Sequence, residues 1–167
     1  YIDPSRRNDH KGKVFKLEDC LPDVCHHLDT FLSHSSNIMI KLSPLLDLSA
    51  TIKSLKFVKE IHIIAVKIEV KELLVLIEKG YQDNPHIKCI NILKGIHDYF
   101  EGSFGSVSQA RYAPVRKYLY EPNASILKSG LFNEVSSKLD VYKLHMNSHL
   151  YTSDDLKPFP GRRFEIL

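Results

Sequence analysis

A carboxylate followed by a proline and two arginines is the first feature of this sequence that could support chemistry. The run Asp3-Pro4-Ser5-Arg6-Arg7 follows Tyr1-Ile2, which we interpret as the end of a strand. Proline imposes an extended exit from the strand, so the Asp3 carboxylate is expected to point into the crevice where open α/β sheets bind ligands. The alternative is a turn aspartate beside two solvated arginines, and from this stretch alone we favour that alternative.

Polar side chains end two further apolar segments in the same way. Lys41 and Ser43 close a strand predicted over residues 37–42, and Lys67 closes one predicted over residues 61–66. We therefore predict that Asp3, Ser43 and Lys67 lie at one edge of a sheet. Each of these side chains could instead be an ordinary surface residue, because exposed ion pairs contribute little to stability.

A group of cysteine and histidine residues suggests a metal site at first sight. Cys20 and Cys25 are followed by His26 and His27, but a Cys-x4-Cys spacing without a second pair fits none of the usual structural zinc patterns. We therefore predict no metal site. Neither a G-x-S-x-G nucleophile motif nor a phosphate-binding loop is present in the sequence.

The elements that would position these residues alternate in the first half of the chain. Apolar spacing predicts helices over residues 22–34, 48–55 and 70–77, the last ended by Gly80, between strands at residues 37–42, 61–66 and 87–93. This order predicts an α/β fold, the C-terminal half of a doubly wound, mostly parallel sheet with helices on both faces. Further βα units are expected before Tyr1.

The second half of the sequence predicts a small α+β domain. Residues 100–114 are rich in glycine and serine and indicate a loop or linker. A strand over residues 115–120, short helices at 124–130 and 131–139, and a strand at 163–166 follow. We predict three parts: residues 1–95 in the sheet domain, a linker at 96–114, and the α+β domain at 115–167.

Composition indicates a globular chain, since 43% of the residues are hydrophobic and 26% are charged. No apolar stretch reaches the ~18 residues of a membrane span, and three cysteines favour a reducing compartment, so we expect a cytoplasmic protein. Residues 111–167 hold nine basic and six acidic side chains, which accounts for the whole net charge of +3. That excess is too small to predict nucleic-acid binding by itself.

Five segments, taken together and in order, resemble one bacterial protein family. They are Asp3 to Arg7, Ile40 to Asp47, Lys67 to Leu74, Tyr118 to Lys128 and Asn147 to Ser153. The family consists of class I S-adenosylmethionine-dependent methyltransferases, common in Bacteroidetes, that end in a THUMP-like domain. The resemblance covers nearly the whole chain, and the segments Y-L-Y-E-P-N-A-S and N-S-H-L-Y-T-S are its most specific parts.

The resemblance implies that Tyr1-Ile2-Asp3 is the fourth strand of a Rossmann-like methyltransferase sheet and that Asp3 and Pro4 are catalytic. Related enzymes that methylate amino groups carry an Asp-Pro-Pro-aromatic motif there, in which the first residues accept hydrogen bonds from the target nitrogen. Ser5 and Arg6 replace the second proline and the aromatic residue. The cofactor, S-adenosylmethionine, would be held by strands before Tyr1, so weak or no binding is expected from these 167 residues alone.

The resemblance also implies RNA as the substrate, because THUMP-type domains contact RNA. Arginines could hold phosphates, and Tyr112, Tyr118 and Tyr120 could stack on bases, although packing inside the domain is the alternative for these tyrosines. The predicted substrate-binding residues are Arg6, Arg7, Lys41, Ser43, Lys67, Arg111 and Arg116. A non-catalytic nucleic-acid-binding or scaffold protein that keeps the methyltransferase fold remains the second hypothesis.

Overall fold

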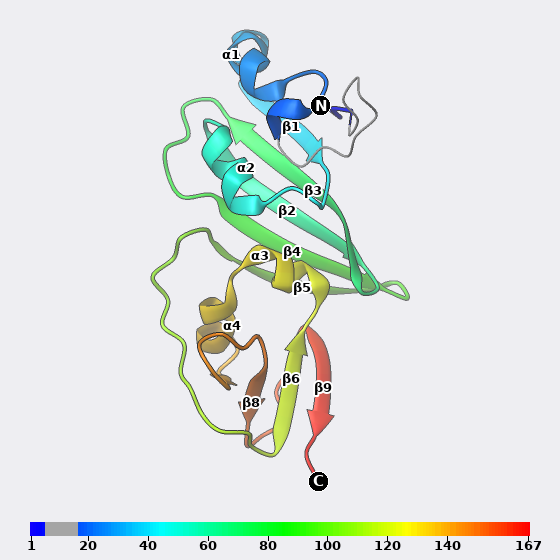
Figure 1. Ribbon diagram of the computed structural model, residues 1–167, viewed down its shortest axis with the longest axis vertical. Coiled ribbons are helices and arrows are strands. Elements are labelled where there is room, and N and C mark those ends of the chain that lie inside the picture. The colour runs from blue at the N-terminus through cyan, green and yellow to red at the C-terminus, as the bar shows by residue number, and fades with distance from the viewer. Residues whose placement is uncertain (6–16) are drawn as a thin grey trace.

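Two β-sheets lie one beyond the other along the long axis of the molecule (Figure 1). The computed structural model describes residues 1–5 and 17–167. The helices are η1 (a 3-10 turn, Leu17–Asp19), α1 (Val24–His34), α2 (Leu48–Ser54), α3 (Ala124–Ser129) and α4 (Phe132–Lys138). The strands are β1 (Asn37–Leu42), β2 (Val58–Val66), β3 (Glu69–Glu78), β4 (His86–Leu93), β5 (Ile96–Ser103), β6 (Tyr118–Pro122), β7 (Tyr142–Lys143), β8 (Tyr151–Ser153) and β9 (Gly161–Glu165).

The first sheet is mixed rather than mostly parallel. Its strand order is β1-β3-β2-β4-β5. Among these strands only β2 and β4 pair in parallel, whereas β1–β3, β2–β3 and β4–β5 are antiparallel. The prediction of an α/β protein with a second, small sheet domain agrees with the structure. The predicted mostly parallel pairing was wrong, because three of the four pairings between the described strands of this sheet are antiparallel.

The helix predicted over residues 70–77 is the main error, because these residues form β3. The chain turns at Lys67, whose φ is 62°, and β3 returns beside β2 as a hairpin. Leu73, Val75 and Ile77 are buried in the core, and the residues between them are half-buried on the opposite face. A run that is apolar on both faces satisfies helical spacing and strand alternation alike, so apolar spacing could not separate them. Gly80 lies in the turn after β3, with a φ of 86°, and caps no helix.

Three helices begin at side chains that satisfy free backbone N–H groups, as N-cap residues do. Asp23 accepts a hydrogen bond from the His26 N–H at 3.0 Å, and Asp47 accepts one from the Ala50 N–H at 2.7 Å. Asn123 caps α3 and Gly130, with a φ of 74°, ends it, as the sequence predicts. The predicted strand at residues 37–42 and the helices at 22–34, 48–55, 124–130 and 131–139 are confirmed to within a few residues.

The segment predicted as a linker contributes a strand to the first sheet. Residues 96–103 form β5, which pairs antiparallel with the whole of β4. Phe100 and Gly102 on this strand are buried, so β5 covers part of the core. Residues 100–114 were predicted as a loop, but residues 100–103 belong to β5, so the loop begins only after this strand.

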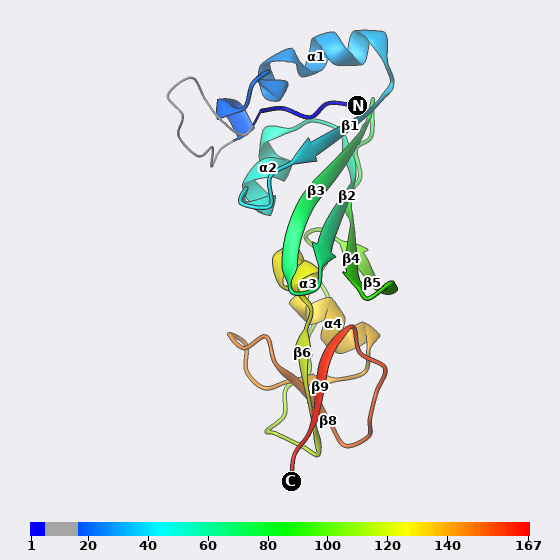
Figure 2. The same ribbon diagram turned by 90° about the vertical axis from the view of Figure 1, so that its right-hand side faces the viewer.

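A single hydrophobic cluster extends from the first sheet into the second module. It includes Ile61 and Leu73 of the first sheet together with Tyr120, Ile126 and Tyr151. Helix α3 packs against β2, β3 and β4, and Figure 2 shows α3 and α4 at the level between the two sheets. The four-stranded sheet, of order β7-β8-β6-β9, is therefore attached to the first sheet through helices that belong to its own segment. No helix among the described residues is both long and apolar enough to span a membrane.

Candidate functional site

Asp3 and Lys41, two of the predicted site residues, are in direct contact. The Ile2 N–H donates to the Met39 carbonyl at 2.8 Å and the Lys41 N–H donates to the Ile2 carbonyl at 2.9 Å, so the start of the chain lies parallel to β1. The Lys41 ammonium lies 2.6 Å from Asp3 Oδ2. This hydrogen bond raises the pKa of Lys41. Pro4 is buried beside the pair.

Glu72 is a third charged residue at this position, and the sequence did not predict it. Its Oε1 lies 3.9 Å from the Lys41 ammonium. Glu72 belongs to β3, so the error over residues 70–77 also concealed this neighbour. Charged residues at positions 69, 71 and 72, just before the apolar run, were the available signal. The cluster Asp3–Lys41–Glu72 is at least partly solvent-exposed: 44% of the Asp3 side chain and 22% of the Lys41 side chain are exposed.

Ser43 and Lys67 lie at the same edge of the sheet as Asp3. Both β1 and β2 run antiparallel to β3, so their carboxyl ends share one edge. The hairpin that contains Lys67 extends beyond Leu42, the last β1 residue paired with β3, and the Lys67 N–H donates to the Ile92 carbonyl at 2.8 Å. Ser43 Oγ accepts the Leu45 N–H at 3.3 Å in the turn that leads to α2. Arg6 and Arg7 lie outside the described residues.

The Cys–His group shows no metal-like arrangement in the described part of the chain. Cys20, Cys25 and Cys89 form no disulfide bond with one another. Burial, followed by the nearby carboxylates of Asp19 and Asp23, raises the pKa of Cys20. No group of three or more His, Cys, Asp or Glu residues with the geometry of a metal site occurs within residues 1–5 and 17–167.

The guanidinium groups of Arg111 and Arg116 both lie against the same aromatic ring. Their guanidinium carbons lie 4.7 and 4.1 Å from the centre of the Tyr142 ring. Each arginine is also bonded to a carboxylate, Arg111 to Asp140 at 2.5 Å and Arg116 to Asp154. Hydrogen bonds from Arg111 and then from Lys157 lower the pKa of Asp140. The structure thus joins two residues predicted from separate positions into one cluster.

The basic excess of residues 111–167 does not form an exposed cationic surface. Six of the nine basic side chains pair with carboxylates: Arg111, Arg116, Lys117, Lys138, Lys157 and Arg162. Lys128 donates to the Leu46 carbonyl at 2.7 Å, and Lys143 donates to the Met146 carbonyl at 3.1 Å. Burial lowers the pKa of both lysines. Of the three basic side chains in this segment without a carboxylate partner, Lys128 and Lys143 therefore point into the protein and Arg163 is exposed.

Tyr118 and Tyr120 differ in their availability to a ligand. Tyr120 is fully buried and its hydroxyl is bonded to Ser153 Oγ at 2.7 Å, so it packs the second module. Tyr118 is half-buried, with the Lys117 ammonium 5.3 Å from its ring centre. Tyr112 is 52% exposed. Base stacking therefore stays a prediction for Tyr112 and Tyr118, whereas Tyr120 packs the interior of the second module.

A second charged group lies on the half-exposed face of the first sheet. Glu60 Oε2 accepts hydrogen bonds from His62 at 2.9 Å and from Lys88 at 2.8 Å. On the neighbouring strands, Glu101 Oε2 lies 3.1 Å from His86 Nε2. The bonds from His62 and Lys88 lower the pKa of Glu60 from 4.5 to about 2. Cross-strand pairs of this kind stabilise a sheet and fix its register.

Replacing Glu60 by glutamine is expected to reduce the acid sensitivity of folding. Because the folded-state pKa is the lower one, the stabilisation is fully present above pH ~4.5 and is lost as the pH falls toward ~2. Glu60→Gln should cost about 1–2 kcal/mol at pH 7, after allowance for solvent screening, and flatten the stability profile over that range. Urea unfolding at a series of pH values from 7 to 2 measures both the loss of stability at pH 7 and the change in the pH profile. Glu69→Gln, at a 71% exposed side chain bonded to Lys71, is the control and should leave the profile unchanged.

Comparison with known proteins finds a matching family model for part of the chain and a similar solved structure. Residues 118–160 match a family described as a ferredoxin-like domain. A solved structure from Porphyromonas gingivalis W83, described as a "putative methyltransferase", is similar over the whole chain, with 38% sequence identity and a TM-score of 0.87. The match covers 100% of this chain and 42% of that one, so the chain spans less than half the length of that protein. No curated protein matches the chain. The chain therefore shares its fold and more than a third of its residues with part of a methyltransferase-like protein.

Proposed function

We propose that this chain is part of an S-adenosylmethionine-dependent methyltransferase that acts on RNA in the cytoplasm. The observation that carries the proposal is the similarity over the full chain to the Porphyromonas gingivalis protein. The position of Asp3-Pro4 supports it, because these residues follow a segment parallel to β1 at the carboxyl edge of the sheet. Under this proposal, Tyr1-Ile2-Asp3 is the fourth strand of a Rossmann-like sheet, and the second module has a THUMP-like role in substrate binding.

Asp3 is the residue that we assign to the acceptor. An ionised carboxylate accepts hydrogen bonds, and an acceptor amino group needs such a partner to direct its lone pair at the methyl donor. Lys41 already binds Asp3 Oδ2, so it fixes the orientation of the carboxylate and competes with a cationic acceptor for it. Ser43 and Lys67, at the same edge, are assigned to the substrate.

The described residues do not by themselves form a site for the cofactor. Asp3 and Lys41 are bonded to one another and are partly solvent-exposed, whereas small-molecule sites enclose most of the ligand surface. We therefore assign no chain residue to S-adenosylmethionine and expect no saturable micromolar binding by the 167-residue chain.

RNA is proposed as the acceptor on the basis of the cluster formed by Arg111, Arg116 and Tyr142. Planar guanidinium groups suit phosphate oxygens, and a nucleic acid would exchange its phosphates for Asp140 and Asp154. Each arginine–phosphate contact then contributes less to the free energy of binding, because an existing ion pair has to be broken first. We therefore expect RNA affinity in the micromolar range or weaker.

The second candidate is a non-catalytic binding or scaffold protein. The Asp3–Lys41 contact favours it, since a carboxylate occupied by a lysine resembles an ordinary surface ion pair. The two candidates differ in one measurable property, which is methyl transfer by the full-length protein.

Transfer of labelled methyl groups from S-adenosylmethionine to RNA by the full-length protein tests the proposal. Asp3→Asn should reduce the rate about a hundredfold, the lower end of the range for a positioned group that acts on the reacting nitrogen. Asp29→Asn is the matched control, because Asp29 is an exposed aspartate with a lysine partner, Lys56, at 3.0 Å. Incorporation that is equal in both variants removes Asp3 from the reaction. RNA binding without any incorporation supports the scaffold instead.

A further inference from the structure

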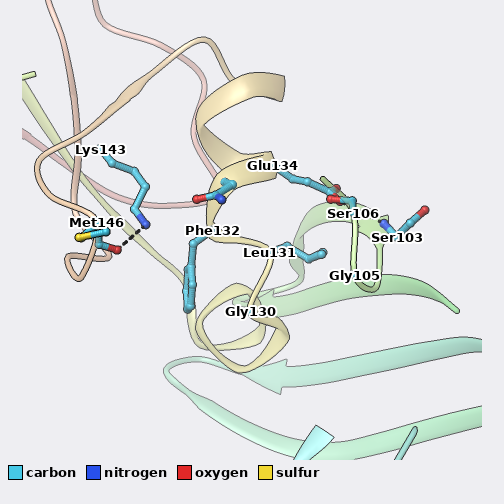
Figure 3. A pocket seen from close by; sticks show the side chains of 10 residues that line it. Ser103, Gly105, Ser106, Gly130, Leu131, Phe132, Glu134, Lys143 and Met146 are labelled. Atoms are coloured by element: carbon cyan, nitrogen blue, oxygen red, sulfur yellow. Dashed lines mark hydrogen bonds between the residues drawn. The ribbon is translucent and has the colours of Figure 1, made fainter. Parts of the chain in front are cut away.

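A cavity of about 320 Å³ lies where the second module meets the first sheet. Its walls come from three separate parts of the chain: the turn after β5, the junction between α3 and α4, and the segment after β7 (Figure 3). Ser103, Phe132, Glu134 and Lys143 are among the side chains on these walls. This volume is near the lower end of the ~300–1,000 Å³ typical of ligand pockets, so only a small molecule would fit.

Lys143 contributes a buried positive charge to this cavity. Only 3% of its surface is exposed. Its ammonium donates one hydrogen bond, to the Met146 carbonyl at 3.1 Å, and lies 5.7 Å from the centre of the Phe132 ring. An ammonium group has three donors, and no carboxylate within the described residues pairs with this one. A buried charge without a counter-ion destabilises the folded state, and proteins normally pair such groups.

Glu134 does not supply the missing counter-ion. Its carboxylate faces the end of β5, where Oε1 accepts the Ser103 N–H at 3.3 Å. The Lys138 ammonium lies 3.2 Å from Oε2, outside hydrogen-bonding geometry, and balances its charge. In Figure 3, Lys143 and Glu134 line different sides of the cavity. The charges of Glu134 and Lys138 therefore cancel, and the positive charge of Lys143 in the cavity stays without a counter-ion.

We propose that this cavity binds a compact oxyanion, a carboxylate or phosphate group of a small molecule, with Lys143 as its counter-ion. The negative charge would complete the ion pair that Lys143 lacks. The Ser103 hydroxyl provides a neutral hydrogen-bond donor on another wall, where the Ser106 hydroxyl donates to Ser108 Oγ at 3.3 Å. Phe132 is held by stacking on His149, with 3.8 Å between the ring centres, and gives the cavity a rigid apolar side.

Thermal unfolding of the 167-residue chain against acetate and against inorganic phosphate, each compared with chloride at equal ionic strength, tests the proposal. We expect the midpoint to rise with one of the two oxyanions and to saturate, which also identifies the preferred group. Lys143→Met keeps the length of the side chain and removes its charge, so it should weaken this binding at least tenfold. Lys56→Met is the control, at a 63% exposed lysine that does not line the cavity, and should leave this binding unchanged.

The stability of Lys143→Met without ligand separates a binding role from a structural one. A buried charge that serves to bind a ligand destabilises the protein when the ligand is absent. Without ligand, Lys143→Met should therefore unfold at the same temperature as the wild type or higher. A lower midpoint would show that the Lys143–Met146 hydrogen bond is structural and would overturn the proposal. The proposal also fails if neither oxyanion gives a saturable shift beyond chloride, or if Lys143→Met keeps the shift.

Discussion

Replacing Gly102 by alanine is expected to destabilise the protein by about 2–3 kcal/mol, since the new methyl group would enter the space of a buried carboxylate. A Cβ at this position would lie 1.8 Å from Glu134 Oε2 and 2.6 Å from its Cδ. Only 4% of the Glu134 side chain is exposed, so the carboxylate could move aside only into the adjoining cavity. Displacing it would also take the acceptor away from the Ser103 N–H. Urea unfolding followed by circular dichroism measures the loss.

The double variant Gly102→Ala/Glu134→Ala shows whether the collision is the cause. If it is, the two changes should be less costly together than the sum of the single changes, by more than about 1 kcal/mol. His97→Ala, at an exposed position of the same strand, controls for substitution in β5 and should cost less than about 0.5 kcal/mol. A Gly102→Ala variant as stable as this control would mean that Glu134 relocates freely and does not join the two modules.

Elements that depend on local signals were predictable from the sequence. Helix α3 is the clearest case, because Asn123 satisfies the Ile126 N–H and Gly130 adopts the left-handed conformation that ends the helix. Strand β1 was predictable for a similar reason, since Pro44 follows it closely. In each case the deciding residues lie within a few positions of the element they delimit.

Strand β3 was not predictable from apolar spacing, because its conformation depends on its neighbours. It lies between β1 and β2, with one face in the core and the other half-buried, and therefore has an unbroken apolar run from Leu73 to Ile77. Its hairpin turn at Lys67 and Ile68 contains neither the glycine nor the asparagine that usually marks such a turn. Tertiary pairing therefore decided between helix and strand.

The candidate site was predictable as a set of strand ends but not as a set of contacts. Asp3 and Ser43 share an edge because Ile2 and β1 run in parallel, which the alternating pattern indicated. The pairing of Lys41 with both Asp3 and Glu72 required the position of β3. The net charge was a misleading guide to the surface for a related reason. Composition cannot tell exposed lysines from inward-pointing ones, and only the fold shows that Lys128 and Lys143 donate to backbone carbonyls.

Removal of one hydroxyl group, by Tyr120→Phe, is expected to cost about 2–3 kcal/mol and to loosen the second module. Tyr120 is fully buried, and its hydroxyl is bonded to Ser153 Oγ at 2.7 Å, to the Asp155 carbonyl at 3.0 Å and to the Lys157 N–H at 3.0 Å. Phenylalanine keeps the ring packed against Phe159 but leaves the Lys157 N–H without its acceptor. An unsatisfied buried donor costs more than an average hydrogen bond contributes.

The location of this loss can be measured as well as its size. The three bonds tie the segment after β8 to β6, so Tyr120→Phe should increase amide hydrogen exchange at residues 153–157 more than in the first sheet. Tyr112→Phe is the matched control, because this tyrosine is 52% exposed, and it should change stability by less than about 0.5 kcal/mol. Equal stability of the two variants would show that the Tyr120 hydroxyl contributes no more than a solvated one. A uniform increase in exchange would contradict this expectation and mean that the two modules unfold together through the hydrophobic cluster that Ile61, Ile126 and Tyr151 share.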